Sequence, residues 1–503
     1  MRHSRKVLLF LPPYSGPVFG APLGLLSLAS SLRHAGFEPR IVDGAIDRNY
    51  RRTIADQLED CCCFGVSLLT GPMILSAIEI SRMAKDLRPD LPVVFGGWHP
   101  TLESAQTLRE DFIDVVVRHQ GEITLVELLR RMESGCELDF VAGCWFKRNG
   151  RIVHNPDRPT VSLSELPPPA YDLIDFDAYE RATGDRKLPY AASIGCPYAC
   201  NYCTDMVYYN RRFNAYDTER VVAEMTDLAV RHRLTEIALV DSNFLVDVPR
   251  AISIARGIRD SGVRFKWTFQ TSTNLLCRMS QEEVGLLAKS GVRYIGFGTE
   301  SASPEVLRHM NKAHQNVPDM YETAEKCAKA GIRVTFNLIF GFPGEEERHR
   351  EETLRVVADI ARQYGNVDFS PNLFTPYPGI PIWPDLEEHG LRPPDSLAKW
   401  ARVDLGTNNL PWLSGSSLRM LERSIRYLNL HTRISRLRRD SPSKMLRALL
   451  DLAGMPLLWR FRHSCFKWPW ELLLARAKAL RVIRRSLLTG QALSQNLARG
   501  AAR

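Results

Sequence analysis

Two stretches of the chain alternate short apolar runs with segments of helical periodicity. In the first stretch, continuous runs of Val, Ile, Leu and Phe predict five strands, at Lys6–Leu11, Arg40–Asp43, Phe64–Leu68, Val93–Gly96 and Asp114–Val117. Such apolar strands, separated by helices, are typical of a parallel sheet that is covered on both faces. We therefore expect a doubly wound α/β domain over residues 1–150, which binds its ligand outside the carboxyl ends of the strands.

The second alternation predicts six more strands. They are expected at Tyr190–Gly195, Glu236–Asp241, Arg264–Gln270, Tyr294–Gly298, Val334–Phe340 and Asp368–Phe374. Six β/α units are too few for the eight-stranded barrel, so we predict a partial (β/α)6 barrel over residues 188–400. The polar, proline-rich residues 151–187 are expected to link the two domains.

The strand pattern stops after Trp400, and residues 401–503 are predicted to form a basic α-helical region. The chain has 503 residues, of which 45% are hydrophobic and 24% charged, as in ordinary globular proteins with several domains. Its net charge is +9, but residues 412–503 alone hold 19 Lys and Arg against 4 Asp and Glu. A body without excess positive charge is not a nucleic-acid-binding domain, so we expect no nucleic-acid partner.

The distribution of apolar residues also shows whether the chain is expected to span a membrane. The longest nearly apolar stretch, residues 448–459, contains Asp451 and is far shorter than the ~20 residues of a spanning helix. No secretory signal is recognised at the basic N-terminus, so we expect a cytoplasmic protein whose 11 cysteines are ligands or buried thiols. Arg mixed with Leu, Ile and Trp in the C-terminal region leaves two alternatives open, a solvated helical cap over the barrel or peripheral membrane contact.

Three cysteines, Cys196, Cys200 and Cys203, follow the first predicted barrel strand on one loop. A structural zinc site would need a fourth Cys or His close by, whereas the next cysteine is Cys277. Three thiolates fit a [4Fe–4S] cluster with one open iron, because a closed cluster takes four. The spacing therefore predicts an open iron–sulfur site at the mouth of a parallel barrel.

The motif C-x3-C-x-aromatic-C, followed by six β/α units, resembles the radical S-adenosylmethionine (SAM) superfamily. The resemblance implies that the open iron chelates the amino and carboxylate groups of SAM and that one electron from the cluster cleaves it to a 5′-deoxyadenosyl radical. It also implies a one-electron reductant of the flavodoxin or ferredoxin type. By position in the family's motifs, the residues implied to bind SAM are Tyr202, Asp241, Glu300, Ser301, Asn337, Gly341 and Pro343.

The N-terminal domain resembles the Rossmann-like, cobalamin (B12)-binding domain of one branch of this superfamily. The resemblance implies cobalamin contacts from the loops after the predicted strands, at Gly24, Asp43, Ser67, Thr70, Gly96, Gly97, His99 and Thr101. The two adjacent glycines lack Cβ atoms, which lets the backbone approach a bulky planar ligand. No G-x-G-x-x-G follows the first strand, which argues against a dinucleotide.

The family motif D-x-H-x-x-G, which supplies an axial histidine to cobalt, is absent from Pro12–Gly24. We therefore expect no cobalt ligand from that loop, with the cofactor's own base displaced. For His99 we favour a helix-capping or supporting role over cobalt ligation.

The combined resemblance favours a cobalamin-dependent radical SAM C-methyltransferase that acts on an unactivated carbon. It implies that one SAM methylates cobalt, while a second gives the radical that removes a substrate hydrogen. The basic, apolar tail suggests a small-molecule substrate that is hydrophobic or a natural product. Two alternatives stay open: non-methylating ring closure, as in the similar anaerobic magnesium-protoporphyrin IX monomethyl ester cyclase group, and a non-catalytic iron–sulfur or corrin-binding protein. No catalytic acid or base is marked in the sequence.

Overall fold

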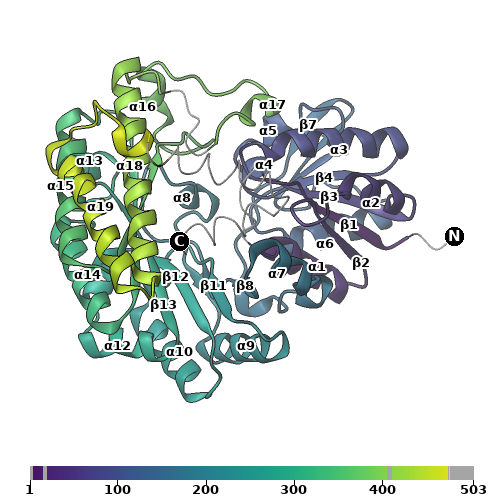
Figure 1. The fold of residues 1–503 in the computed structure, drawn as a ribbon. Helices are drawn as coiled ribbons and strands as arrows, with labels where there is room; N and C mark the ends of the chain where they lie inside the picture. The colour runs from purple at the N-terminus through teal and green to yellow at the C-terminus, as the bar shows by residue number, and fades with distance from the viewer. Residues whose placement is uncertain (1–3, 15–19, 405–409, 474, 476–503) are drawn as a thin grey trace, which may run out of the picture.

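Two α/β bodies form the molecule, and α8 lies between them (Figure 1). The computed structural model describes residues 4–14, 20–404, 410–473 and 475. The N-terminal domain is purple to blue in Figure 1, the barrel is teal to green, and the C-terminal helices run along the outside of the barrel.

The N-terminal domain is built on a seven-stranded sheet of order β2-β1-β3-β4-β5-β6-β7. Its strands are β1 (Lys6–Leu11), β2 (Glu38–Asp43), β3 (Cys61–Ser67), β4 (Val93–Gly96), β5 (Val115–Val117), β6 (Cys144–Arg148) and β7 (Arg151–His154). The first five are parallel, as predicted. The last two add an antiparallel hairpin at the β5 edge, so the expected five-stranded sheet is extended, and β7 lies in the segment expected as linker.

Helices cover both faces of this sheet. They are α1 (Leu23–His34), α2 (Tyr50–Gln57), α3 (Met73–Leu87), α4 (Trp98–Leu102), α5 (Ser104–Thr107) and α6 (Gly121–Glu133). Successive strand residues point to opposite faces. Accordingly, Val7 and Leu9 of β1 pack in one core with α1 and α6, and Leu8 and Phe10 pack in the other with α2 and α3.

The second sheet confirms the predicted partial barrel. Its six parallel strands follow the order β15-β14-β13-β12-β11-β8. They are β8 (Lys187–Tyr190), β11 (Glu236–Leu239), β12 (Lys266–Thr271), β13 (Val292–Glu300), β14 (Arg333–Phe340) and β15 (Val367–Leu373). The first strand ends at Tyr190, earlier than the predicted Tyr190–Gly195, because the chain then turns into a short antiparallel pair, β9 (Ser193–Ile194) with β10 (Asn214–Ala215).

Helices connect the barrel strands on the outside. The main ones are α9 (Thr218–Arg231), α10 (Val248–Asp260), α12 (Gln281–Lys289), α14 (Val317–Ala330) and α15 (Glu347–Gln363). Shorter helices are α7 (Phe176–Thr183), α8 (Thr204–Tyr208), α11 (Thr273–Cys277), α13 (Pro304–His309), α16 (Trp383–Glu388) and α17 (Leu397–Trp400). Local signals fix several starts, such as the capping box of Ser280 with Glu283 that opens α12.

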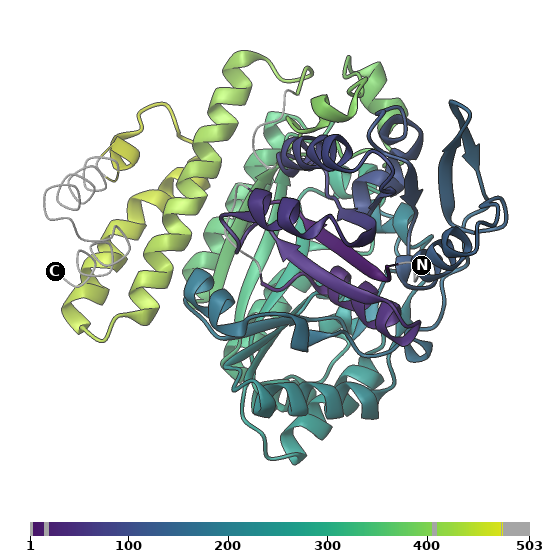
Figure 2. The ribbon, with the colours of Figure 1, turned by 90° about the vertical axis from the view of Figure 1, so that its right-hand side faces the viewer.

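In the C-terminal region two long helices, α18 (Gly415–Asp440) and α19 (Lys444–His463), lie side by side against the barrel, and the described residues there form no strand (Figure 2). Helix α18 covers the open edge of the barrel. The Thr432 hydroxyl accepts a hydrogen bond from Phe369 N (3.1 Å) and donates one to Phe369 O (2.9 Å), both on β15. An exposed strand edge invites pairing with other chains, so this cap protects the sheet. No helix among the described residues is long and apolar enough to cross a membrane.

Candidate functional site

The three motif cysteines lie on the loop between β9 and α8. All three thiols are free. Burial raises the pKa of each, that of Cys203 to about 12, and Cys196 acts electrostatically on Cys200 as Cys200 does on Cys203. The thiols are therefore near enough to interact electrostatically, although the three sulfur atoms are not all within 4.8 Å of one another, and they are protonated when no cation is bound. A bound metal deprotonates such a ligand, so the loop is suited to hold a metal cluster.

The loop is held from behind by the end of β11. The Asp241 carboxylate accepts hydrogen bonds from Ala192 N (2.9 Å) and from the Ser193 hydroxyl. Burial raises the pKa of Asp241 to about 6. The Asn243 amide lies 3.8 Å from Cys196 Sγ and donates to Ser272 Oγ at 3.0 Å. Asp241 thus supports the segment before the loop, and in this structure both of its carboxylate oxygens accept hydrogen bonds from that segment.

Three side chains, two of them buried, form a polar cluster beside the loop. Tyr202 donates to Glu300 Oε1 at 3.1 Å, and Lys312 Nζ lies 3.1 Å from both Glu300 Oε1 and the Tyr202 hydroxyl oxygen. Glu300 and Lys312 are only 7% and 6% exposed. Burial lowers the pKa of Lys312, but the negative charge of Glu300 and its hydrogen bond, with a further contribution from the neighbouring Cys200 and Cys203, outweigh it, and the net pKa is raised. The ammonium group therefore stays charged close to the cluster loop.

The backbone at Glu300 is unusual. Its φ of 58° lies in the left-handed region, and the pairing of β13 with β14 shifts register between Gly298 and Glu300. A non-glycine residue in this region costs on the order of 1 kcal/mol and is typical of functional sites. The next residue, Ser301, points inward, where its hydroxyl lies 3.2 Å from that of Thr353. The bulge therefore aims Glu300, and not Ser301, at Tyr202 and Lys312.

The remaining residues predicted to bind SAM lie on β14 and the turn after it. Asn337 donates to Gln270 Oε1 at 3.3 Å. Gly341 has a φ of 77°, and its N–H donates to the buried carboxylate of Glu345 at 2.6 Å. Pro343 is buried within the same turn. These residues shape one wall at the carboxyl end of the barrel.

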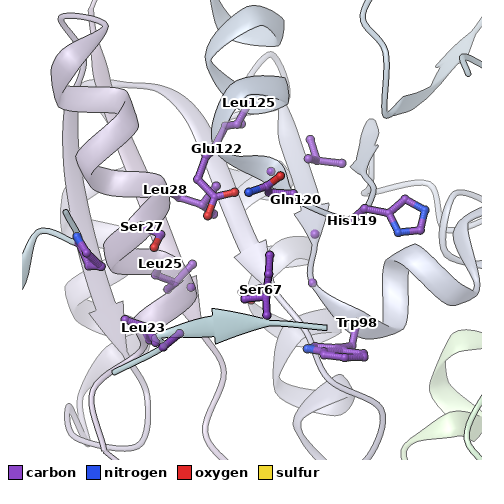
Figure 3. Close-up of a pocket in the computed structure, with 18 of the residues that line it drawn as sticks. Leu23, Leu25, Ser27, Leu28, Ser67, Trp98, His119, Gln120, Glu122 and Leu125 are labelled. Carbon is purple, nitrogen blue, oxygen red and sulfur yellow. The ribbon is translucent and has the colours of Figure 1, made fainter. Parts of the chain in front are cut away.

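A cavity of about 410 Å³ lies between the N-terminal domain and the barrel (Figure 3). It opens at the carboxyl ends of β3 and β4 and beside α1 and α6. Four of the predicted cobalamin residues line it: Gly24, Ser67, Gly96 and Gly97. Gly97 has a φ of 93°, and a Cβ there would lie 3.0 Å from Leu68 N, so only glycine fits without strain.

Gln120 and Glu122 are among the polar side chains that line this mostly apolar cavity (Figure 3). Gln120 Oε1 accepts from Val161 N at 2.9 Å, while Gln120 Nε2 is buried with no partner among the described residues. Burial raises the pKa of Glu122. An apolar cavity with a few unsatisfied polar groups is typical of a ligand pocket.

The other four predicted cobalamin residues do not line the cavity. Asp43 accepts from the Tyr179 hydroxyl at 2.6 Å. The hydroxyl of Thr70 lies 2.9 Å from Nδ1 of His99, and burial lowers the pKa of His99 to about 3. Thr101 accepts from the His119 amide at 2.9 Å. Their side chains brace the loops around the cavity, and residues 15–19 of the first loop lie outside the described residues.

Helix α8 joins the cavity to the cysteine loop. It begins directly after Cys203, and Tyr208 at its end stacks on Trp98 of α4, with ring centroids 4.2 Å apart. The Tyr208 hydroxyl also donates to His119 O at 2.6 Å. The two sites therefore face the same interdomain region.

Comparisons with known proteins identify the family. The model of the radical SAM superfamily matches residues 190–357, and that of the B12 binding domain matches residues 17–129. The uncharacterized methyltransferase PH0819 of Pyrococcus horikoshii is 31% identical over 390 residues, which cover 75% of this chain and 82% of that protein. The chain belongs to the cobalamin-binding radical SAM superfamily. It is accordingly an enzyme.

This cobalamin-binding radical SAM enzyme has further relatives. Hopanoid C-3 methylase of Methylococcus capsulatus is 26% identical over 379 residues, covering 72% of this chain and 68% of that protein. The structure of the cobalamin-dependent SAM radical enzyme OxsB, with aqua-cobalamin and SAM bound, superposes with a TM-score of 0.74 at 15% identity, covering 99% of this chain and 83% of that chain. The latter likeness shows that the fold is shared.

The residues present fit the cofactors of this family, a [4Fe–4S] cluster, SAM and cobalamin. Three free thiols share one loop, which suits a cluster with one open iron. Beside them, Asn274 Oδ1 and His314 Nε2 are buried polar atoms with no partner among the described residues. The wall of the interdomain cavity includes glycine backbone, and the Gln120 amide nitrogen in it has no hydrogen-bond partner among the described residues.

Among the residues of these sites that the sequence does not single out are two charged ones, Lys312 and Glu122. Neither belongs to a motif considered above, and a single Lys or Glu carries no pattern of its own. Lys312 follows α13 by three residues and reaches back to Glu300 in space. Glu122 stands in the first turn of α6, where an acidic residue is ordinary for helix stability.

Proposed function

We propose that this enzyme is a cobalamin-dependent radical SAM C-methyltransferase acting on an unactivated carbon of a hydrophobic or natural-product substrate. The observation that carries the proposal is the link through α8, which places the cysteine loop and the interdomain cavity around one region. A methyl transfer between two cofactors needs both of them next to one substrate. The methylase relatives support the same chemistry.

In this proposal the cysteine loop holds the cluster through Cys196, Cys200 and Cys203. Tyr202, Glu300 and the turn of Gly341 and Pro343 contact SAM, and Ser301, Asn337 and Asp241 support these contacts. The three cofactors supply, when bound, a carbon-centred radical and a transferable methyl group. Lys312 keeps its proton beside Glu300 and balances negative charge near the loop.

The cavity takes the corrin cofactor in this proposal. Gly24, Ser67, Gly96 and Gly97 contact it directly, and Thr70, Asp43, His99 and Thr101 brace the surrounding loops. Because the neutral His99 ring is buried against Thr70 and Trp400, it supports the fold. We also propose that the sheet domain extends through β7, with the linker following His154.

The test is anaerobic reconstitution with iron, sulfide, cobalamin and SAM, followed by product analysis. A gain of one CH2 in the substrate, together with 5′-deoxyadenosine, supports methylation. Loss of hydrogen or gain of oxygen supports the oxidative cyclase alternative. Absence of 5′-deoxyadenosine after reduction supports a non-catalytic binding protein. The matched control is Cys196→Ala/Cys200→Ala/Cys203→Ala, which should lose both the iron and the nucleoside product.

We further propose that α19 contacts an anionic membrane surface, which would bring a hydrophobic substrate near the enzyme. Five apolar residues recur every three or four positions along this helix and are each more than half exposed: Met445, Leu449, Leu452, Met455 and Trp459. The opposite face packs inward through Leu457 and Phe461. A helix that is apolar on both faces needs a second apolar environment, and the positive charge of the region favours anionic lipid.

Vesicle flotation tests this contact with the full chain, since removing α18 would uncover the edge of β15. Leu449→Ser/Leu452→Ser should lower binding to anionic phosphatidylglycerol vesicles at least about tenfold, because each buried leucine contributes ~1.5–3 kcal/mol. The matched control is Leu75→Ser/Leu87→Ser, two exposed leucines of α3. Equal flotation of both variants and the unchanged chain would rule the contact out.

A further inference from the structure

The outer side of the cysteine loop reaches the surface. Pro197, directly after Cys196, is exposed, whereas Cys200 is buried. Two segments from elsewhere in the barrel border this exposed tip, one on each side, and both carry exposed arginines. Arg211 and Arg212 stand on the first segment and Arg308 on the second.

The first segment is the tight turn before β10. Asn210 and Arg211 both have positive φ, 50° and 57°. Arg211 Nε donates to Pro197 O at 3.2 Å. A Cβ at Gly195 would lie 1.9 Å from Arg212 O, so this turn lies directly on the backbone that precedes Cys196. Arg211 and Arg212 are therefore fixed next to the loop.

The second segment is the end of α13 and the residues after it. Asn201 N donates to Met310 O at 3.1 Å, and the Asn201 amide donates to His309 O at 2.7 Å. The Asn311 amide donates to Ala199 O at 2.7 Å. This segment lies against the loop between Cys196 and Cys203, which places Arg308 beside it.

The charge of this surface is positive. Among the described residues, the guanidinium groups of Arg212 and Arg308 have no hydrogen bond or ion pair, and that of Arg211 binds only a carbonyl. Two nearby acids have partners of their own: Asp385 Oδ2 lies 3.0 Å from His309 Nε2, and Glu305 pairs with Arg348 at 3.0 Å. Clustered, uncompensated charge of one sign speeds the approach of a partner of the opposite sign.

We propose that Arg211, Arg212 and Arg308 form a docking surface for an acidic one-electron donor, a reduced flavoprotein or iron–sulfur protein. The proposal rests on the proposed function, in which this loop holds the cluster. One electron leaves the reduced cofactor of the donor and enters the oxidised cluster, and no bond is made or broken.

The test compares two reductants on the reconstituted holoenzyme with Arg212→Glu/Arg308→Glu. Bleaching of the cluster's visible absorbance is followed by stopped flow, with reduced flavodoxin as the acidic protein donor and reduced methyl viologen as a small cation that needs no docking. At low salt the variant should be reduced by flavodoxin at least about tenfold more slowly than the unchanged enzyme, and the difference should shrink at high salt. Reduction by methyl viologen should stay within about twofold.

The control is Arg256→Glu/Arg264→Glu, which makes the same charge change at two exposed barrel arginines, on α10 and before β12. It should leave the flavodoxin rate unchanged. An equal loss in both variants would mean that overall charge matters and would overturn the docking surface, as would an unchanged rate in Arg212→Glu/Arg308→Glu. Equal slowing with both reductants would also overturn it, because the arginines would then support the loop. A wild-type chain that viologen cannot reduce would instead refute the cluster assignment, and the docking surface with it.

Discussion

Lys312→Met tests whether the buried pair beside the cysteine loop is an ion pair that stabilises the barrel. The substitution removes the ammonium group 3.1 Å from Glu300 Oε1 and leaves that carboxylate, which is 7% exposed, without a cation. Removing one partner of a buried pair costs about 3–5 kcal/mol. In a domain of 150–250 residues each kcal/mol lowers the melting temperature by about 2–4 °C, so we expect the melting temperature of the barrel to fall by at least about 6 °C.

The control is the double variant Glu300→Gln/Lys312→Met, which removes both charges and keeps similar volumes. It should melt above Lys312→Met, since replacing both partners avoids the unpaired charge. Calorimetry of the apo chain measures the shift, and hydrogen exchange assigns the transition to the barrel, because a chain of several domains need not unfold in one step. If the shift of the double variant equals the sum of the shifts of Lys312→Met and of the single variant Glu300→Gln, coupling between Glu300 and Lys312 is refuted.

Three further predictions follow from single positions. Gly24→Leu places a side chain in the cavity, and its Cβ would have no other atom within 4 Å. Cobalamin affinity should therefore fall at least about tenfold, while the stability of the protein is kept. The control for both measurements is Gly285→Leu, an equally open helix position. At Gly195, with a φ of 76°, an added Cβ would meet the Arg212 carbonyl, so Gly195→Ala should lower the bound iron several-fold. The control is Gly262→Ala, which has a φ of 75° and open space around the Cβ. It should lower the free energy of unfolding by only about 1 kcal/mol and keep the iron. Burial raises the pKa of Glu345 to about 7, so its contribution to stability is present below its unfolded pKa of ~4.3 and is lost as the pH rises through 7. Between pH 5 and pH 8, the free energy of unfolding of Glu345→Gln should therefore rise by about 2–3 kcal/mol relative to that of the wild type. Urea unfolding measures both, and parallel pH profiles of the two proteins would contradict this.

The strands that the sequence predicts well are those that are apolar on both faces. The run at β1 is correct to the residue, because its alternate side chains fill two separate cores. The hairpin of β6 and β7 is missed because its residues mix Lys and Arg with apolar side chains at a sheet edge. Its turn, Asn149-Gly150, with φ values of 50° and 75°, is a hairpin signal that could have located it.

The sites show the same division between local pattern and tertiary contact. The cysteine loop is recognised because all three thiols stand within eight residues of one another. Glu300 is recognised by its motif, but its partner Lys312 comes from the segment after α13, and only the fold brings the two together. The cavity divides the predicted cobalamin residues in the same way. Residues whose backbone forms its wall, such as Gly96, line it, while His99 turns away into the core.

Helix α8 connects the two halves of the molecule. Its first residue follows Cys203, and its last, Tyr208, is held by Trp98 and by the carbonyl of His119 in the N-terminal domain. His119 itself has a φ of 56°, and its Nδ1 lies 2.7 Å from Tyr208 O, so the contact is doubled. A ligand that moves the loop before α6 would move Tyr208, and through a helix of five residues the last cysteine. We therefore expect a ligand in the cavity to shift the cysteine loop through these packed contacts.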